Sequence, residues 1–163
     1  MTALQLQYQA THDHLTGLRN RSCLEQELLD AMTRCDENPR RQLAVVAIDL
    51  NDFKHINDSH GHAAGDHLLQ NIAQRFKRIK RKSDLIFRTG GDEFVWIVEG
   101  LDAVNKPSFV NRINTALSMP IEYQGHLLAV TGSIGIATYP SDAASPDELL
   151  NQADQAMYHN KGS

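Results

Sequence analysis

The 163-residue chain has no apolar run long enough to cross a membrane, and its N-terminus lacks the basic start and apolar centre of a signal peptide. We therefore expect the chain in the cytoplasm, and any membrane anchor would belong to another part of a parent protein. Cysteine is scarce as well, with only Cys23 and Cys35 present. On one helix these two residues would lie about 18 Å apart, too far for a disulfide. Two free thiols fit a reducing compartment.

The chain also lacks an excess of positive charge. Its formal net charge is -4, which argues against nucleic acid as a partner. One segment departs from this balance, because "RFKRIKRK" (75–82) holds six basic residues and no acidic one. We expect an anion site near this segment. The sequence contains no GxxxxGK[ST] phosphate-binding loop, so a nucleotide would have to be bound by a different kind of site.

The pattern of apolar residues predicts an α+β fold with a mostly antiparallel central sheet flanked by helices. We expect one domain over 1–163, with a lead-in segment at 1–21 that is polar and turn-rich over 11–21. Helices are predicted at 22–35, 68–79, 109–117 and from 145 onward. Strands are predicted at 43–49, 84–88, 94–98, 121–124 and 127–138. A capping box of Ser22 and Glu25 should begin the first helix.

Two adjacent carboxylates stand in "RTGGDEFVWIVEG", at the turn between two predicted strands. Asp92 and Glu93 repel each other there, and a divalent cation would remove that cost. Asp49, at the end of strand 43–49, could add a third carboxylate, and hard oxygen ligands of this kind suit Mg²⁺. Gly90 and Gly91 would let the backbone turn sharply and approach a phosphate. The alternative is an ordinary Gly-Gly turn with solvated acids, which composition alone favours.

The segment after Asp49 has the features of a nucleotide site. A helix beginning near residues 52–54 would direct free N–H groups at an anion. Asn57 and Asp66 could recognise guanine, because a carboxylate accepts from its N1–H and N2–H₂ donors, which adenine lacks. Turn capping is the alternative for both residues. Four histidines also lie within 55–67, but no HExxH motif or cysteine pair accompanies them, which argues against zinc.

These residues together resemble the GGDEF domain family, the diguanylate cyclases of bacterial signalling. The signature GGDEF is intact at 90–94. Four further motifs follow the family order: "DHLTGLRNR" (13–21), "FKHINDSHGHAAGD" (53–66), "SIGIATYP" (133–140) and "ADQAMYHNK" (153–161). The resemblance covers essentially the whole chain and implies a fold similar to nucleotidyl cyclases and polymerase palms.

The resemblance also implies an activity, the condensation of two GTP molecules into cyclic di-GMP with release of two pyrophosphates. Each domain would hold one GTP, so a homodimer would be needed, with Mg²⁺ (or Mn²⁺) as cofactor. The implied metal ligands are Asp49, the Leu50 carbonyl, Asp92 and Glu93, of which Asp92 and Glu93 are also the catalytic residues. The implied substrate-binding residues are Phe53, Lys54, Asn57, Asp66, Gly90, Gly91 and Lys161.

"RKSD" (81–84) matches the family's inhibitory product site, an R-x-x-D before the signature. Arg81 would bind a phosphate or the guanine edge of the product, and Asp84 would bind the base. The alternative is a basic helix end that turns into a strand.

The chain departs from the family pattern at two places. Asn51 stands where the family often has aspartate, which should not abolish metal binding. The closing K-x-x-G-R-N pattern is cut after Lys161, so we expect a fragment of a longer protein, with an adjacent sensor or phosphodiesterase domain. These departures leave an alternative function open, a catalytically silent module that binds GTP or cyclic di-GMP.

Overall fold

A computed structural model describes residues 1–38 and 41–161. Its helices are α1 (Ala3–Thr11), the 3₁₀ turn η1 (Arg21–Cys23), α2 (Leu24–Glu37), α3 (Phe53–His60), α4 (His62–Ile79), α5 (Lys106–Ser118) and α6 (Pro146–Lys161). Its strands are β1 (Leu43–Leu50), β2 (Leu85–Arg88), β3 (Glu93–Glu99), β4 (Ile121–Tyr123), β5 (His126–Leu128) and β6 (Gly132–Tyr139). None of the helices in the described part of the chain combines the length and hydrophobicity that crossing a bilayer requires.

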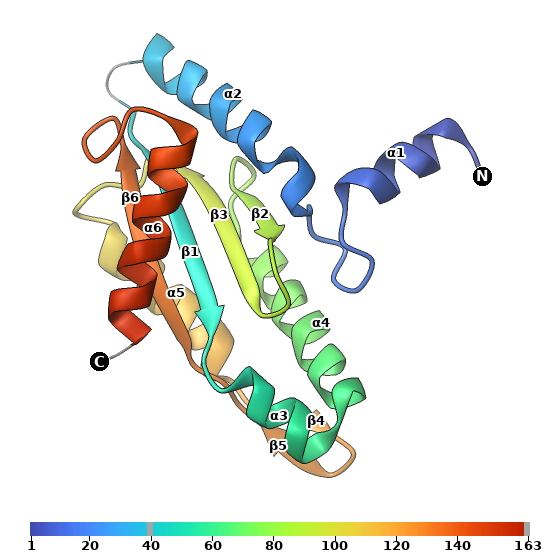
Figure 1. The fold of residues 1–163 in the computed structure, drawn as a ribbon. Coiled ribbons are helices and arrows are strands. Elements are labelled where there is room, and N and C mark those ends of the chain that lie inside the picture. The colour runs from blue at the N-terminus through green and yellow to red at the C-terminus, as the bar shows by residue number, and fades with distance from the viewer. Residues whose placement is uncertain (39–40, 162–163) are drawn as a thin grey trace.

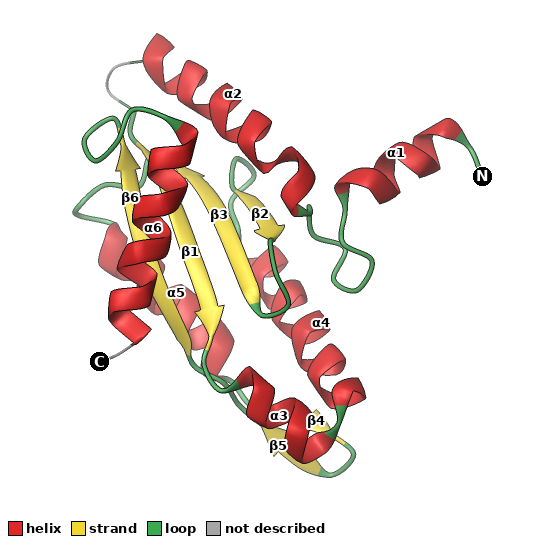
Figure 2. Ribbon diagram, in the orientation of Figure 1, coloured by secondary structure: helices red, strands yellow, loops and turns green. Residues whose placement is uncertain are grey.

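The central sheet is antiparallel, with strand order β2-β3-β1-β6 (Figure 1). Strand β1 is central because every residue of "LAVVAIDL" is buried, so both of its faces need covering. Helices α4 and α5 pack with Val46, Ile48 and Trp96 in one apolar cluster. Helices α2 and α6 pack with Val45 and Ile97 in a second cluster. Figure 2 shows the resulting three layers, with the sheet between two pairs of helices. The predicted fold class is therefore confirmed.

Helix α6 lies unusually close to the sheet. A Cβ atom built on Gly135 of β6 would stand 2.1 Å from both the Ala153 carbonyl oxygen and the Met157 nitrogen. Because both contacts are backbone atoms, only glycine allows this approach. Helix α6 begins as predicted, since the Glu148 N–H donates to Ser145 Oγ at 3.3 Å.

Two local predictions need correction. The expected strand 127–138 is two strands, because β5 pairs with β4 in a separate two-stranded sheet while β6 joins β1. The Ser22–Glu25 capping box is wrong. The cap is Asn20, whose Oδ1 accepts from the Ser22 N–H at 2.9 Å, so η1 precedes α2. Helix α1, in the first half of the lead-in segment, was not predicted; it buries no residue and extends away from the sheet (Figure 1).

Candidate functional site

The register of the sheet brings the predicted carboxylates together. Asp49 at the end of β1 pairs with Glu93 at the start of β3. The Leu50 N–H donates to the Asp92 carbonyl at 3.0 Å, which fixes the turn beside β1. Oxygen atoms of Asp49, Asp92 and Glu93 lie within 4.8 Å of one another. Three carboxylates at this separation can ligate one hard cation such as Mg²⁺.

The charges of this cluster are only partly balanced. Burial raises the pKa of Asp92 above its usual value, and the negative charge of Asp49 raises it further. Burial and the same neighbour also raise the pKa of Glu93. The Lys161 ammonium donates to Asp49 Oδ2, and this hydrogen bond raises the pKa of Lys161. Asp49 Oδ1 is buried with no hydrogen-bond partner in the described residues, so this donor set fits an added cation.

The turn between β2 and β3 is held by residues far away in the sequence. Arg88 donates to the Gly91 carbonyl at 2.9 Å and to both oxygens of Asp13 at 3.0 and 3.1 Å. Burial alone would raise the pKa of Asp13, but hydrogen bonds from Thr16 and Arg88 outweigh it and lower the pKa. Sequence reasoning missed this support, although Asp13 opens one of the recognised motifs. The lead-in segment thus fixes the turn that carries Asp92.

The glycines of this turn make room for a carboxylate. A Cβ built on Gly90 would lie 3.0 Å from Glu93 Oε2, whereas one on Gly91 would meet no atom within 4 Å. The Glu93 side chain therefore folds back over Gly90, and Gly91 faces open space. Gly91 is exposed, although its carbonyl accepts from Arg88.

Helix α3 starts directly after β1, at the same edge of the sheet. Asp52 adopts a left-handed conformation with φ 59°, and its side chain makes no capping hydrogen bond. The first N–H groups of the helix, at Phe53 and Lys54, are therefore not capped by Asp52. Uncapped N–H groups at a helix start can bind phosphate oxygens.

Asn51 anchors the connection between β1 and α3. Its backbone N–H donates to the Thr131 carbonyl at 2.9 Å, and its Nδ2 donates to Thr131 Oγ1 at 2.9 Å. Its Oδ1 accepts from Ser133 Oγ at 2.9 Å. Sequence reasoning noted Asn51 only as a departure from a pattern. No local signal indicates these bonds, because both partners lie on or next to the distant strand β6.

Asn57 and Asp66 come from two successive helices, α3 and α4. Asn57 is half-buried and Asp66 is exposed. A Cβ on Gly65 would lie 1.9 Å from Asn57 Oδ1, so Asn57 packs directly on the first turns of α4, beside Asp66. The structure thus places both predicted guanine readers where the two helices meet.

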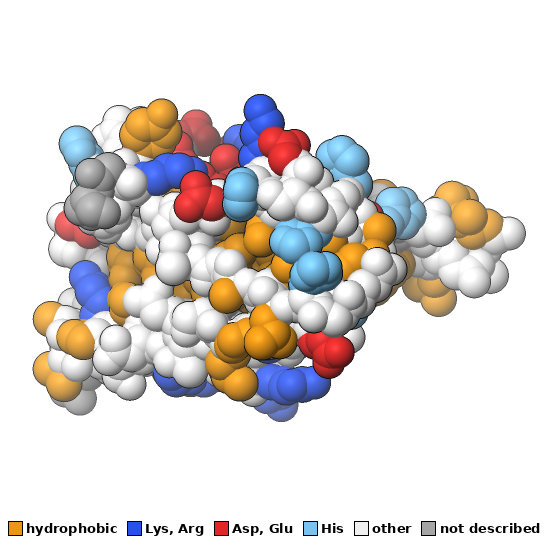
Figure 3. Space-filling model, turned by 90° about the horizontal axis from the view of Figure 1, so that it is seen from below, with side chains coloured by type: hydrophobic (Ala, Val, Ile, Leu, Met, Phe, Trp, Pro, Cys, Tyr) orange, Lys and Arg blue, Asp and Glu red, His pale blue; other side chains and the backbone are white. Residues whose placement is uncertain are grey.

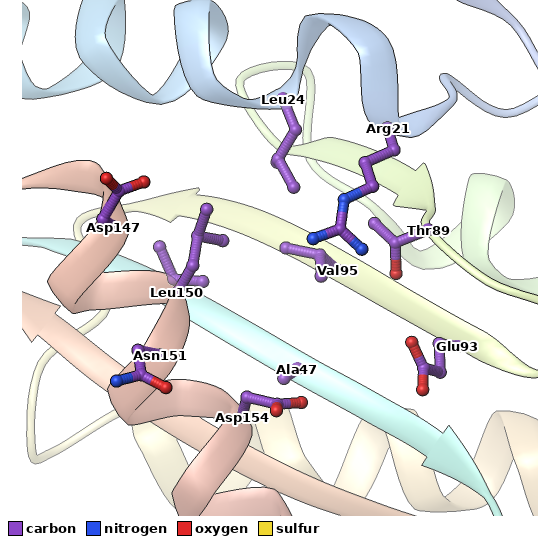
Figure 4. A pocket seen from close by; sticks show the side chains of 11 residues that line it. Arg21, Leu24, Ala47, Thr89, Glu93, Val95, Asp147, Leu150, Asn151 and Asp154 are labelled. Atoms are coloured by element: carbon purple, nitrogen blue, oxygen red, sulfur yellow. The ribbon is translucent and has the colours of Figure 1, made fainter.

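A pocket of about 360 Å³ opens beside Glu93 on the face of the sheet covered by α2 and α6. Figure 4 shows Arg21, Thr89 and Asp154 around it, together with Glu93. Asp154 raises the pKa of Glu93 and Arg21 lowers it, so both act electrostatically on this carboxylate. The Glu93 carboxylate thus borders a cavity on the side of the sheet that carries α2.

Arg81 and Asp84 lie at the connection between α4 and β2, away from this cluster. Asp84 is fully buried and accepts from the Arg81 backbone N–H at 2.8 Å. The Arg81 side chain lies 3.5 Å from the Asp84 carboxylate and donates to the Glu99 carbonyl at 2.7 Å. Since β3 runs from Glu93 to Glu99, the pair stands at the opposite end of that strand from Asp92.

A family model described as "Diguanylate cyclase, GGDEF domain" matches residues 10–163. Among curated proteins, the diguanylate cyclase TpbB of Pseudomonas aeruginosa is 44% identical over 158 residues, which cover 94% of this chain and 35% of that protein. The bifunctional diguanylate cyclase/cyclic di-GMP phosphodiesterase MucR of the same organism is 40% identical over 93% of this chain and 22% of MucR. The chain thus spans about a third or less of these relatives.

Solved structures agree with the sequence relatives. A GGDEF family protein from Caulobacter crescentus superposes with a TM-score of 0.88 at 37% identity, over 93% of this chain and 98% of that one. The isolated GGDEF domain of TpbB gives a TM-score of 0.87 at 42% identity, over 93% of this chain and 88% of that one. With the signature turn, the antiparallel sheet and the family match in agreement, the chain belongs to the GGDEF domain family.

Proposed function

We propose that this chain is a diguanylate cyclase domain that condenses two GTP molecules into cyclic di-GMP. The observation that carries the proposal is the convergence of Asp49, Asp92 and Glu93 from two strands that are distant in sequence. The relative TpbB, 44% identical over most of this chain, is named a diguanylate cyclase.

Magnesium is the proposed cofactor, held by Asp49, the Leu50 carbonyl, Asp92 and Glu93, and Mn²⁺ fits the same oxygen ligands. Bound Mg²⁺ would acidify the attacking 3′-hydroxyl and stabilise charge on the reacting oxygens. Glu93 borders the adjoining pocket, and its raised pKa suits a group that accepts a proton there.

The remaining substrate contacts are proposed from their positions around the cluster. The N–H groups at Phe53 and Lys54 would bind phosphate oxygens, and Lys161 adds a positive charge at Asp49. Asn57 and Asp66 would bind guanine between α3 and α4. Gly90 and Gly91 would let the triphosphate approach the turn.

A single domain with one such site holds one GTP, so the reaction requires two copies of the chain that face each other. We propose a homodimer in which the 3′-hydroxyl of each GTP attacks the α-phosphorus of the other. The pocket beside Glu93 offers room for part of the second nucleotide. The domain would act in the cytoplasm, where GTP is available.

Product inhibition through Arg81 and Asp84 is a second part of the proposal. A structure of the related DgcB domain, 28% identical with a TM-score of 0.85, is described as a complex with cyclic di-GMP. Because Asp84 is buried and bonded to Arg81, product binding here would rely first on the half-exposed Arg81 guanidinium.

A catalytically silent regulatory module is the second candidate function. One observation favours it: a relative 34% identical over 96% of this chain is named cyclic di-GMP phosphodiesterase NbdA. In such a protein this domain would bind GTP or cyclic di-GMP and control an adjacent phosphodiesterase or sensor domain.

The test measures cyclic di-GMP after incubation of the chain, fused to a dimerising segment, with GTP and Mg²⁺. We expect product from the wild type and from Asp30→Ala, a control that removes an exposed acid on α2. Asp92→Ala should form none. A wild type that binds GTP but forms no product would support the regulatory module instead.

A further inference from the structure

We propose a second cation site on this domain, formed by His60 and His126, for a borderline divalent cation such as Zn²⁺ or Ni²⁺. His60 ends α3 and His126 begins β5, so the two side chains come from distant parts of the chain. Their ring centres lie 5.1 Å apart, with planes tilted by 55°. Neither residue takes part in the carboxylate cluster or in the proposed nucleotide contacts.

The distance of 5.1 Å between the ring centres matches the distance expected when two histidines bind one metal ion. Two imidazoles that bind one tetrahedral metal through nitrogens at about 2.0 Å place their ring centres roughly 5 Å apart. Both side chains are exposed, so each ring is free to turn a nitrogen toward a shared ion. Imidazole nitrogen suits zinc, nickel and copper better than magnesium, so the two cation sites would select different metals.

Histidines gather on this side of the molecule. Figure 3 shows them as a group of side chains on the face that carries α3 and the β4–β5 hairpin. Besides the pair, His55, His62 and His67 belong to α3 and α4. The run 55–67 contains no zinc motif of its own, and the second proposed ligand, His126, comes from the hairpin.

The hairpin is already tied to α4 in the neighbourhood of the pair. His67 Nε2 lies 3.2 Å from the Glu122 carbonyl oxygen, and its ring contacts Tyr123 at 5.3 Å between centres. Helix α3 in turn packs on α4 through Asn57 and Gly65, so α4 holds both segments that carry the pair, which lowers the entropy cost of chelation.

The site would be weak and exchangeable. Among the described residues, the only group of three or more potential ligands close together is Asp49, Asp92 and Glu93. Water would complete the coordination at His60 and His126. An ion held this way would link α3 to the hairpin, and Asn57 lies one turn before His60 on α3. The effect of this ion on guanine binding rests on the proposed function, whereas the ion site itself does not.

The experiment is a titration of the untagged chain with Ni²⁺ by calorimetry, in excess Mg²⁺ to occupy the carboxylates and without nucleotide. We expect one Ni²⁺ per chain and a rise in melting temperature, since a ligand that binds only the folded state stabilises it. His60→Asn, His126→Asn and the double variant should lose this binding to the same extent, because one remaining imidazole cannot chelate. His55→Asn, an exposed histidine on the same helix, is the matched control and should bind as the wild type does.

The proposal is overturned if the wild type binds no Ni²⁺, or if binding survives in either single variant. Equal loss in His55→Asn would also overturn it, since the ion would then belong to another histidine group. These outcomes do not depend on GTP, so they are distinct from failure of the cyclase assay.

Discussion

At the scale of single residues, Asp92 and Glu93 occupy positions that favour their protonated forms. Burial and the neighbouring Asp49 raise the pKa of both groups in the metal-free protein. A carboxyl group whose pKa is higher in the folded than in the unfolded state binds more protons when folded. Its contribution to stability therefore falls as pH rises through the usual carboxyl range. Even with the Lys161 ammonium beside Asp49, the two carboxylates therefore lower the stability of the metal-free protein near neutral pH.

Replacing Asp92 by asparagine should therefore stabilise the metal-free protein near neutral pH. The gain should shrink as the pH is lowered into the carboxyl range, where the wild-type groups are protonated, and Mg²⁺ should stabilise the wild type more than the variant. Urea unfolding with a chelator or with Mg²⁺ measures both effects. Asp30→Asn serves as the control, and a loss of stability in metal-free Asp92→Asn would contradict the interpretation of these pKa shifts.

Asn51 provides a second test at this scale. Its amide accepts from Ser133 and donates to Thr131, and each such bond contributes about 0.5–1.5 kcal/mol. Asn51→Ala removes both bonds, so we expect a loss of about 1–3 kcal/mol together with a higher KM for GTP. Asn51→Asp should cost less, because the Thr131 hydroxyl can donate to the carboxylate.

Urea unfolding and steady-state kinetics on the two Asn51 variants check this prediction. Equal losses of stability in Asn51→Ala and Asn51→Asp would contradict the prediction, because the carboxylate would then not replace the amide at Thr131 and Ser133.

At the scale of elements, the close approach of α6 to β6 is the most sensitive contact. Gly135→Ala would place a methyl group 2.1 Å from two backbone atoms of α6, so the helix must shift. Overpacking of this kind costs about 1–3 kcal/mol, and here we expect the upper end because backbone must move. Cyclase activity should fall as well, because α6 carries Lys161 to the carboxylates.

Urea unfolding of Gly135→Ala against Gly91→Ala measures the effect on stability. Gly91 is the control because an added methyl group there meets no atom. Equal stability of the two variants would show that α6 can move away from β6 at no cost.

Elements with a strong local signal were predictable from the sequence. The apolar run of β1 and the Ser145-Pro146 start of α6 are such signals, and both predictions are confirmed. The 127–138 prediction failed because alternation within a strand does not reveal which sheet it joins. Helix α1 has no buried face, so no apolar period could indicate its position.

In the candidate site, too, features with a local sequence signal were predictable, and features that depend on tertiary contacts were not. The acidic turn is visible as a motif, and its approach to Asp49 could be anticipated from where each strand ends. The support of that turn by Arg88 and Asp13 depends on tertiary contacts between segments 75 residues apart, which no local pattern encodes.

At the scale of the whole molecule, the proposed reaction needs two chains. In the proposed reaction each copy would supply one carboxylate cluster and one set of nucleotide contacts, so the active species would be an encounter of two domains that each hold GTP. We expect the specific activity of the unfused chain to rise with protein concentration, while that of a fused dimer stays constant. Initial rates over a dilution series measure this. A constant specific activity in a chain shown to be monomeric would refute the two-domain mechanism.

The ammonium group of Lys161 rests on Asp49 at the end of the described part of α6. The acidic site therefore already contains a resident cation, tethered to the protein by its own helix. If magnesium binds there as proposed, it can ligate the unpartnered Asp49 Oδ1 while the ammonium stays on Oδ2, and the ammonium also attracts an incoming polyphosphate. The ammonium repels a bare metal ion, whereas a metal ion that arrives with its polyphosphate brings negative charge that the ammonium attracts. Lys161 in the last turn of α6 would thus make the metal ion and the polyphosphate bind cooperatively.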